Sequence, residues 1–115
     1  MKNEDTFKEQ LDSFINERLG DENFSVAELS KLLGCSRTQL YRNIKSTTEL
    51  APSTYIMELR LLRACELLTN VQANDTIANV AYSVGFKDAA YFSRAFKRRF
   101  KMTAVEYREN GMSKS

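Results

Sequence analysis

The side chains with the clearest chemical potential are the positive charges near the C-terminal end of the sequence. Residues 87–101 hold six basic side chains and one acid, a net charge of +5. Guanidinium and ammonium groups bind phosphates and carboxylates through charge-assisted hydrogen bonds. Phe92, Phe96 and Phe100 recur at every fourth position, so a helix would place them on one side and leave most charges elsewhere. The segment therefore predicts a helix that packs through its aromatic side and offers a basic surface to an anion.

Charge is distributed unevenly along the chain. The 115 residues carry a formal net charge of +2. Residues 1–24 contain seven acids and three bases, a net charge of −4, which leaves +6 on residues 25–115. This asymmetry predicts a polyanionic partner for the second part only.

The composition argues against an enzyme, a cofactor or a metal site. The sequence has no histidine, which removes the commonest general base and metal ligand. Its two cysteines, Cys35 and Cys65, are too few for a disulfide framework, and their helical contexts favour buried structural thiols. No apolar run approaches the roughly 18 residues that cross a bilayer, and no segment resembles a signal peptide. We therefore expect a cytoplasmic protein with no membrane contact by this segment.

The apolar spacing predicts an all-α fold of about seven helices, consistent with one Pro and four Gly. The first helix is expected from Thr6, with Glu9 completing a capping box, to a cap at Gly20. Ser25, Ser36 and Asp88 are suited to begin later helices, because their side-chain oxygens can accept from first-turn N–H groups. The later helices are expected over residues 25–33, 36–47, 52–70, 76–84, 88–100 and 104–109, with a polar turn at 71–75.

The chain also contains an internal duplication. Residues 26–34 align with residues 77–85 at an offset of 51, and after the turn the offset becomes 52. In each copy a small residue, Ser30 or Ala81, stands four positions before a glycine, so two helices can approach closely around a tight turn. The pattern is that of a helix-turn-helix. One copy could be an ordinary helical hairpin, but two copies that each end in a basic helix favour DNA binding.

The duplication predicts how the chain is organised. A linking helix of 19 residues would be about 28 Å long, close to the roughly 34 Å between successive major-groove faces of B-DNA. It could hold two recognition helices, at about residues 36–47 and 88–100, in successive major grooves. We expect an acidic N-terminal helix packed on the first unit, a first helix-turn-helix, a linking helix, a second helix-turn-helix and a flexible tail, at residues 1–23, 24–50, 51–71, 72–110 and 111–115.

These motifs resemble the DNA-binding domain of the AraC/XylS family of bacterial transcription regulators, over about residues 7–109. The segments that carry the resemblance are Ser-Arg-Thr-Gln-Leu-Tyr-Arg at 36–42 and the glycine and aromatic pattern from Gly85 to Arg108. The first is similar to the version at the cytoplasmic end of hybrid two-component sensor-regulators. The resemblance implies two homeodomain-like helix-turn-helix subdomains joined by a long central helix. It also implies a sensor or dimerisation domain in the full-length protein, and output to RNA polymerase.

The resemblance further implies which side chains contact double-stranded DNA. Seven positions would face bases: Thr38, Tyr41, Arg42, Ala89, Ala90, Ser93 and Arg94. Six others would lie near phosphates: Ser36, Arg37, Lys45, Lys87, Lys97 and Arg98. Arg42 and Arg94 could each fork onto O6 and N7 of a guanine, whereas the two alanines offer only methyl contact or close approach.

Three residues depart from the family pattern. The family usually has Gly where Glu49 and Lys101 stand, and Pro where Ala104 stands. If Glu49 and Lys101 adopt a left-handed conformation, each is strained by about 1–2 kcal/mol. Ala104 lacks the preset first turn that Pro would give the last helix.

The acidic first helix leaves an alternative open. The chain could be a helical protein-interaction module that docks on a receiver or kinase domain, with weak or no DNA binding.

Overall fold

The computed structural model describes the backbone of residues 3–70 and 75–113, and the side chains of residues 6–70 and 75–110. Over that part of the chain it contains seven α-helices and no strand, which confirms the predicted all-α fold. The helices are α1 (Asn3–Arg18), α2 (Val26–Leu33), α3 (Arg37–Thr48), α4 (Pro52–Thr69), α5 (Ile77–Ser83), α6 (Ala89–Phe100) and α7 (Ala104–Ser113). Apart from Asp75, the polar turn predicted at residues 71–75 lies outside the described residues.

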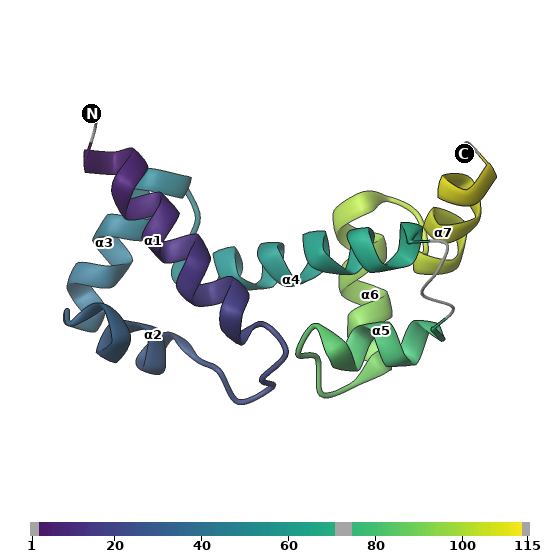
Figure 1. Ribbon diagram of the computed structural model, residues 1–115, viewed down its shortest axis with the longest axis horizontal. Coiled ribbons are helices and arrows are strands. Elements are labelled where there is room, and N and C mark those ends of the chain that lie inside the picture. Colours follow the sequence, from purple (N-terminus) through teal and green to yellow (C-terminus); the bar gives the residue numbers. More distant parts are fainter. Residues whose placement is uncertain (1–2, 71–74, 114–115) are drawn as a thin grey trace. The chain divides into compact units, whose positions relative to one another are not determined.

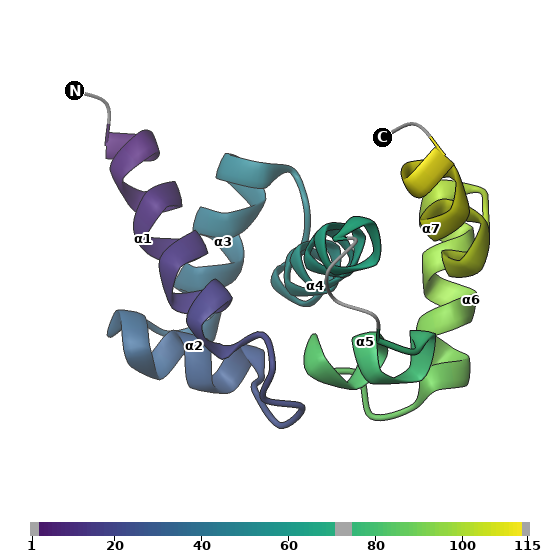
Figure 2. The same cartoon turned by 45° about the vertical axis from the view of Figure 1, so that its right-hand side comes forward.

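The chain divides into two compact units, Met1–Leu59 and Arg60–Ser115, and the division falls inside α4. In unit 1, helices α1, α2 and α3 and the start of α4 enclose one core (Figures 1 and 2). Leu11, Ile15, Leu29, Leu40 and Ile44 have no exposed surface in this core. The apolar stripes that predicted α1, α2 and α3 thus face one another.

Unit 2 is built around the aromatic side of α6, which Figure 1 shows beside α5 and α7. Phe92 and Phe96 are fully buried and their ring centroids lie 5.7 Å apart. Phe86 contacts Phe92 edge-on at 5.1 Å, and Tyr107 of α7 contacts Phe96 edge-on at 5.6 Å. The phenylalanine series therefore packs the core rather than stacking on bases.

The two helix-turn-helix turns have matching backbone hydrogen bonds. Cys35 N donates to Ser30 O, and Phe86 N donates to Ala81 O, both at 3.0 Å. Gly34 has φ 69°, and a Cβ added there would meet no atom within 4 Å. The left-handed backbone, and not lack of room, therefore favours glycine at this turn.

The predicted first residues of the helices are partly confirmed. Ser25, Ser36 and Asp88 are N-caps, since their side chains accept from backbone N–H groups of α2, α3 and α6. The predicted cap at Thr6 is wrong, because α1 already begins at Asn3 and Thr6 lies inside it. At the other end, α7 continues to Ser113, through residues predicted to belong to a flexible tail.

A reciprocal capping box that was not predicted begins α7. The Thr103 amide donates to Glu106 Oε1 at 2.8 Å, and the Glu106 amide donates to Thr103 Oγ1 at 3.1 Å. The hydrogen bond from the Thr103 amide, followed by one from the Thr103 side chain, lowers the pKa of the Glu106 carboxyl. The capping box gives α7 a defined start although Ala104 stands where the family usually has Pro.

Helices α3 and α6 both end at a residue with a left-handed backbone. Glu49 has φ 65° and its amide donates to Lys45 O at 2.8 Å. Lys101 has φ 63° and its amide donates to Lys97 O at 2.8 Å. The condition for strain is therefore met at both positions where the family usually has Gly.

Candidate nucleic-acid interface

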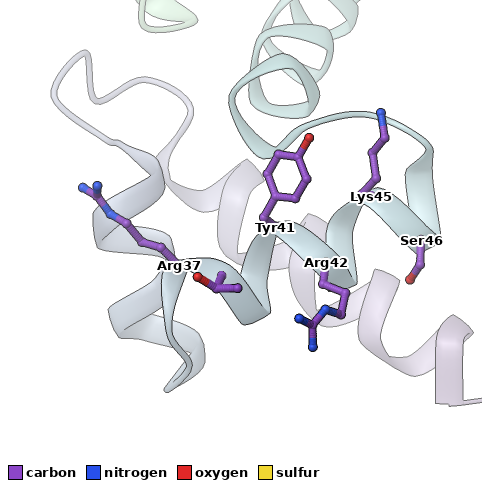
Figure 3. Close-up of a pocket in the computed structure, with 6 residues that line it drawn as sticks. Arg37, Tyr41, Arg42, Lys45 and Ser46 are labelled. Atoms are coloured by element: carbon purple, nitrogen blue, oxygen red, sulfur yellow. The ribbon is translucent and has the colours of Figure 1, made fainter.

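One side of α3 presents two parallel rows of exposed side chains. Leu40 and Ile44 are fully buried, and this fixes which side of the helix faces solvent. Side chains four positions apart lie above one another on a helix. Figure 3 shows Tyr41 and Lys45 pointing to one side, and Arg42 and Ser46 to the other. The rows are Arg37–Tyr41–Lys45 and Thr38–Arg42–Ser46, and we call these six residues the α3 face.

The α3 face lines a surface hollow of about 690 Å³. All six lining residues come from one helix, so the hollow is an open surface and not an enclosed cleft. Three of the six side chains are basic and none is acidic. Such a surface suits an extended polyanion better than a small enclosed ligand.

An equivalent set of positions exists on α6. Adding 52 to each residue number of the α3 face gives the α6 face: Ala89, Ala90, Ser93, Arg94, Lys97 and Arg98. Ala89 is half-buried and the other five are exposed. The same shift carries the buried pair Leu40 and Ile44 onto the buried pair Phe92 and Phe96. The two helices therefore direct equivalent positions to solvent.

The structure separates the basic residues at the end of α6. Lys97 and Arg98 belong to the two rows of the α6 face, whereas Arg99 lies outside them. The Arg99 guanidinium lies 4.8 Å from the centre of the Phe100 ring, a cation–π contact. Arg99 thus contacts an aromatic ring of its own helix.

The N-termini of the two helices differ in charge. The neutral hydroxyl of Ser36 accepts from the Gln39 amide at 3.1 Å. The Asp88 carboxylate accepts from the amides of Ala90 and Tyr91 at 2.8 and 3.4 Å. A phosphate near α6 would meet a negative charge that α3 lacks. Lys87, in the turn before Asp88, is exposed and has no equivalent on the α3 face.

The offset of 52 between the two faces identifies a site residue that was not predicted. Ser46 lines the hollow but was not predicted to be a site residue. Its position is equivalent to Arg98, so the offset of 52 could have revealed it. At the same offset Arg37 and Ala89 are equivalent positions. The family resemblance nevertheless implied a phosphate contact for Arg37 and a base contact for Ala89.

The described part of the chain offers neither a metal site nor a membrane-spanning helix. No group of His, Cys, Asp and Glu side chains there could hold a metal ion. Likewise, none of the described helices is long and apolar enough to cross a membrane.

Comparison with known proteins identifies the family of this chain. A family model described as a helix-turn-helix domain matches residues 29–110. The chain belongs to the AraC-type helix-turn-helix family. Relatives of this AraC-type domain are transcription regulators such as the activator RhaR of Mannheimia succiniciproducens, which is 32% identical over 106 residues. The match covers 92% of this chain and 37% of RhaR.

A second relative of this AraC-type domain is named as a kinase. Histidine kinase P4 of Formosa agariphila is 39% identical over 93 residues, which cover 81% of this chain and 7% of that protein. The chain thus spans less than two fifths of the length of either curated relative.

Solved structures share the fold of this AraC-type domain. The C-terminal domain of the two-component response regulator yesN from Fusobacterium nucleatum has a TM-score of 0.80 and 28% identity, over 90% of this chain and 98% of that one. The DNA-binding domain of AdpA, solved in complex with a target DNA, has a TM-score of 0.82 and 24% identity, over 91% and 92%. The family resemblance predicted from the sequence is thereby confirmed.

Proposed function

We propose that this domain binds double-stranded DNA sequence-specifically, as the DNA-binding part of a bacterial transcription regulator. Its recognition helices are α3 and α6, which enter successive major grooves. The observation that carries the proposal is the repeated face: equivalent exposed positions on two helices, each with three basic and no acidic side chains. Two helices that bind successive major grooves of one duplex each need a basic exposed surface.

The roles of the side chains follow from their places on the two faces. Arg42 and Arg94 occupy the same middle position, from which a guanidinium can fork onto a guanine. Thr38, Tyr41, Ala89, Ala90 and Ser93 lie toward the N-terminal ends, where recognition helices contact base edges. Six side chains at or beyond the edges would position the domain on phosphates: Ser36, Arg37, Lys45, Lys87, Lys97 and Arg98.

The relatives support this assignment. RhaR is named a transcriptional activator, and the AdpA domain, which shares the fold, was solved with a target DNA. The yesN and kinase names both belong to two-component signalling. We therefore place the domain in a longer cytoplasmic or cytoplasm-facing regulator with a sensor or dimerisation domain, and RNA polymerase is the partner that would receive its output. We assign the domain itself no catalytic activity.

A selection of bound sequences from random duplexes tests the proposal, followed by binding titrations at several salt concentrations. The selection should enrich a defined motif. Six phosphate contacts predict a log–log salt slope near −5, or roughly a thousandfold loss of affinity from 50 to 200 mM salt. Absence of an enriched motif, together with salt-independent binding, would contradict the proposal.

The exposed acids of α1 support a second candidate function. Glu9 and Glu17 are exposed on this helix, and Asp21 and Glu22 are exposed just after it. This surface could dock on a basic patch of a receiver or kinase domain. Binding to such an isolated domain, with no measurable DNA affinity at low salt, would favour this interaction module over the DNA-binding function.

A further inference from the structure

We infer that Asp12 of α1 is a positioning residue for DNA binding by α3, and that it acts through the hydroxyl of Tyr55. By this hydrogen bond α1 holds α3 in one orientation, so that the α3 face meets the duplex in a single geometry. The inference rests on the proposed function. It adds a residue in the N-terminal helix, to which the proposed function gives no contact with DNA.

Apolar packing fixes the orientation of α1 less strictly than a hydrogen bond does. Leu11 and Ile15 of α1 are fully buried in the same core as Leu40 and Ile44 of α3. Burial of apolar surface is non-directional, so it constrains the distance between two helices more than their rotation or sliding. A directional contact between α1 and the rest of unit 1 therefore helps to select one arrangement.

Asp12 supplies such a contact to the start of α4. The Tyr55 hydroxyl donates to Asp12 Oδ1, although the two residues are 43 positions apart in the sequence. Tyr55 is only 6% exposed, and it belongs to the core that contains Leu40 and Ile44. A hydrogen bond to a carboxylate has a preferred direction and is stronger than one between neutral groups. The bond therefore fixes Tyr55 relative to α1.

Further hydrogen bonds connect Tyr55 to α3. The Tyr55 amide donates to Ala51 O at 2.9 Å. Between the two helices, the Thr48 hydroxyl donates to Ile44 O at 2.8 Å and accepts from the Leu50 amide at 3.1 Å. Ile44 is fully buried, on the side of α3 opposite the α3 face. The end of α3 and the first turn of α4 are thus tied together, so a shift of Tyr55 relative to α1 reaches α3.

Lys8 shares the Asp12 carboxylate without making this link. It pairs with Oδ2 at 2.9 Å, whereas Tyr55 uses Oδ1. The Lys8 side chain is 49% exposed, and exposed ion pairs contribute little to stability. Removing Lys8 should therefore leave the bond between Asp12 and Tyr55 in place, which makes this lysine a useful control.

Binding titrations on a selected duplex and on random duplex test the inference, with the ratio of the two affinities as the readout. Loss of folded protein lowers both affinities alike. A changed charge also acts on both, because attraction to phosphates carries no sequence information. Tyr55→Phe keeps the ring and removes the hydroxyl. It should lower the ratio about three- to tenfold, within what one hydrogen bond can contribute, and Asp12→Ala should do the same.

Two control variants separate the hydrogen bond from the charge. Asp12→Asn removes the same charge as Asp12→Ala, but it keeps an oxygen that can accept from Tyr55. Lys8→Gln removes the ion pair and keeps the bond to Tyr55. Both variants should keep the ratio within about twofold of the natural protein, because neither loses the hydrogen bond.

The double variant Asp12→Ala, Tyr55→Phe distinguishes positioning from a merely structural role. Asp12→Ala takes the carboxylate acceptor from a buried hydroxyl, and Tyr55→Phe then removes that hydroxyl. The double variant should therefore unfold at a higher urea concentration than Asp12→Ala alone. Its affinity ratio should stay as low as in either single variant, because the link between α1 and α4 is still absent.

The outcomes separate the inference from the proposed function. If the natural protein prefers the selected duplex and Tyr55→Phe keeps that preference, the inference is overturned. A ratio that recovers together with stability in the double variant would overturn it as well. Circular dichroism checks folding, and Tyr55→Phe with Asp12→Asn decides the matter even where Asp12→Ala does not fold. If the natural protein shows no preference over random duplex, the proposed function itself fails.

Discussion

The hydroxyl of Tyr55, at the start of α4, donates a hydrogen bond to the Asp12 carboxylate in α1. Lys8, one turn before Asp12, pairs with the same carboxylate at 2.9 Å, and its ammonium lies 5.9 Å from the centre of the Tyr55 ring. In unit 2, Tyr107 is equivalent to Tyr55 at the offset of 52, and its side chain hydrogen-bonds Cys65. Each unit thus uses a tyrosine to fasten its last helical segment to its first.

The variant Tyr55→Phe should lower the free energy of unfolding by about 1–2 kcal/mol, because hydrogen bonds to charged groups are the stronger ones. Asp12 keeps Lys8 as a partner and keeps some contact with water, which limits the loss. The matched variant Tyr107→Phe should cost less, about 0.5–1 kcal/mol, because a thiol is a weak hydrogen-bonding partner. Urea unfolding measures both. Equal losses would show that the Asp12 bond adds nothing over its thiol counterpart.

Alkaline pH should weaken the same contact. Burial, followed by the hydrogen bond to Asp12, raises the pKa of Tyr55 above its ordinary 10.0, and the bond to Asp12 raises the pKa of Lys8 above 10.5. For both groups the folded state favours the protonated form. Their contribution is fully present below the unfolded pKa and is lost as pH rises through the folded pKa. The free energy of unfolding should stay constant up to about pH 9.5 and decrease at higher pH.

Variants show which part of that fall belongs to the cluster of Lys8, Asp12 and Tyr55, because the pKa of Tyr107 is raised as well. In Tyr55→Phe the decline above pH 10 should be shallower, because one of the two linked protons is absent. The control Tyr82→Phe changes a tyrosine that is 51% exposed, and it should leave the profile as in the natural protein. A Tyr55→Phe profile parallel to the natural one would contradict the assignment.

Replacing the left-handed residues with glycine should stabilise the domain. Glu49 and Lys101 have φ of 65° and 63°, a conformation that costs a residue with a Cβ about 1–2 kcal/mol. Glycine removes that strain, but it loses more conformational entropy on folding, which offsets part of the gain in stability. Glu49→Gly and Lys101→Gly should each add up to about 1 kcal/mol in thermal unfolding. Glu49→Ala, which keeps a Cβ, is the control and should add nothing.

Caps show how far sequence reasoning reaches in this fold. Ser25, Ser36 and Asp88 were predictable, because each polar cap stands just before an apolar helical stripe. The pattern Thr-x-x-Glu occurs at both Thr6 and Thr103, yet only Thr103 begins a helix. The two threonines are locally alike, and what differs is whether the preceding residues can continue the helix. A short pattern does not contain that information.

The sequence predicts some features of the candidate site better than others. It predicts which positions are exposed, because buried aliphatic and aromatic residues fix which side of each helix faces solvent. It does not predict which contact each basic side chain makes. Lys97, Arg98 and Arg99 are adjacent in sequence, and only the structure shows Arg99 over the Phe100 ring.

Two arginines of α6 should therefore behave differently in DNA binding. Arg94→Ala should weaken binding to a selected site by about 1–3 kcal/mol and weaken binding to random duplex much less, because a guanine contact would be lost. Arg99→Ala removes the same charge from outside the α6 face and should reduce affinity for both duplexes slightly and equally. Fluorescence anisotropy with the two duplexes measures both variants. Equal losses on selected and random DNA for Arg94→Ala would show that Arg94 contacts only the backbone.

The charge of the α6 N-cap should oppose DNA binding. Asp88 places a carboxylate at the N-terminus of α6, where α3 has the neutral Ser36. Asp88→Ser keeps a good N-cap and removes the charge, so the loss of stability should stay below about 1 kcal/mol. Removing the repulsion between that carboxylate and phosphates should raise affinity about two- to fivefold at low salt, with a smaller gain at high salt. Ser36→Asp is the matched reverse change and should weaken binding by a similar factor. If neither change alters affinity, phosphates do not approach the N-terminus of either helix, and the helices would have to contact the duplex through their middle and C-terminal residues alone.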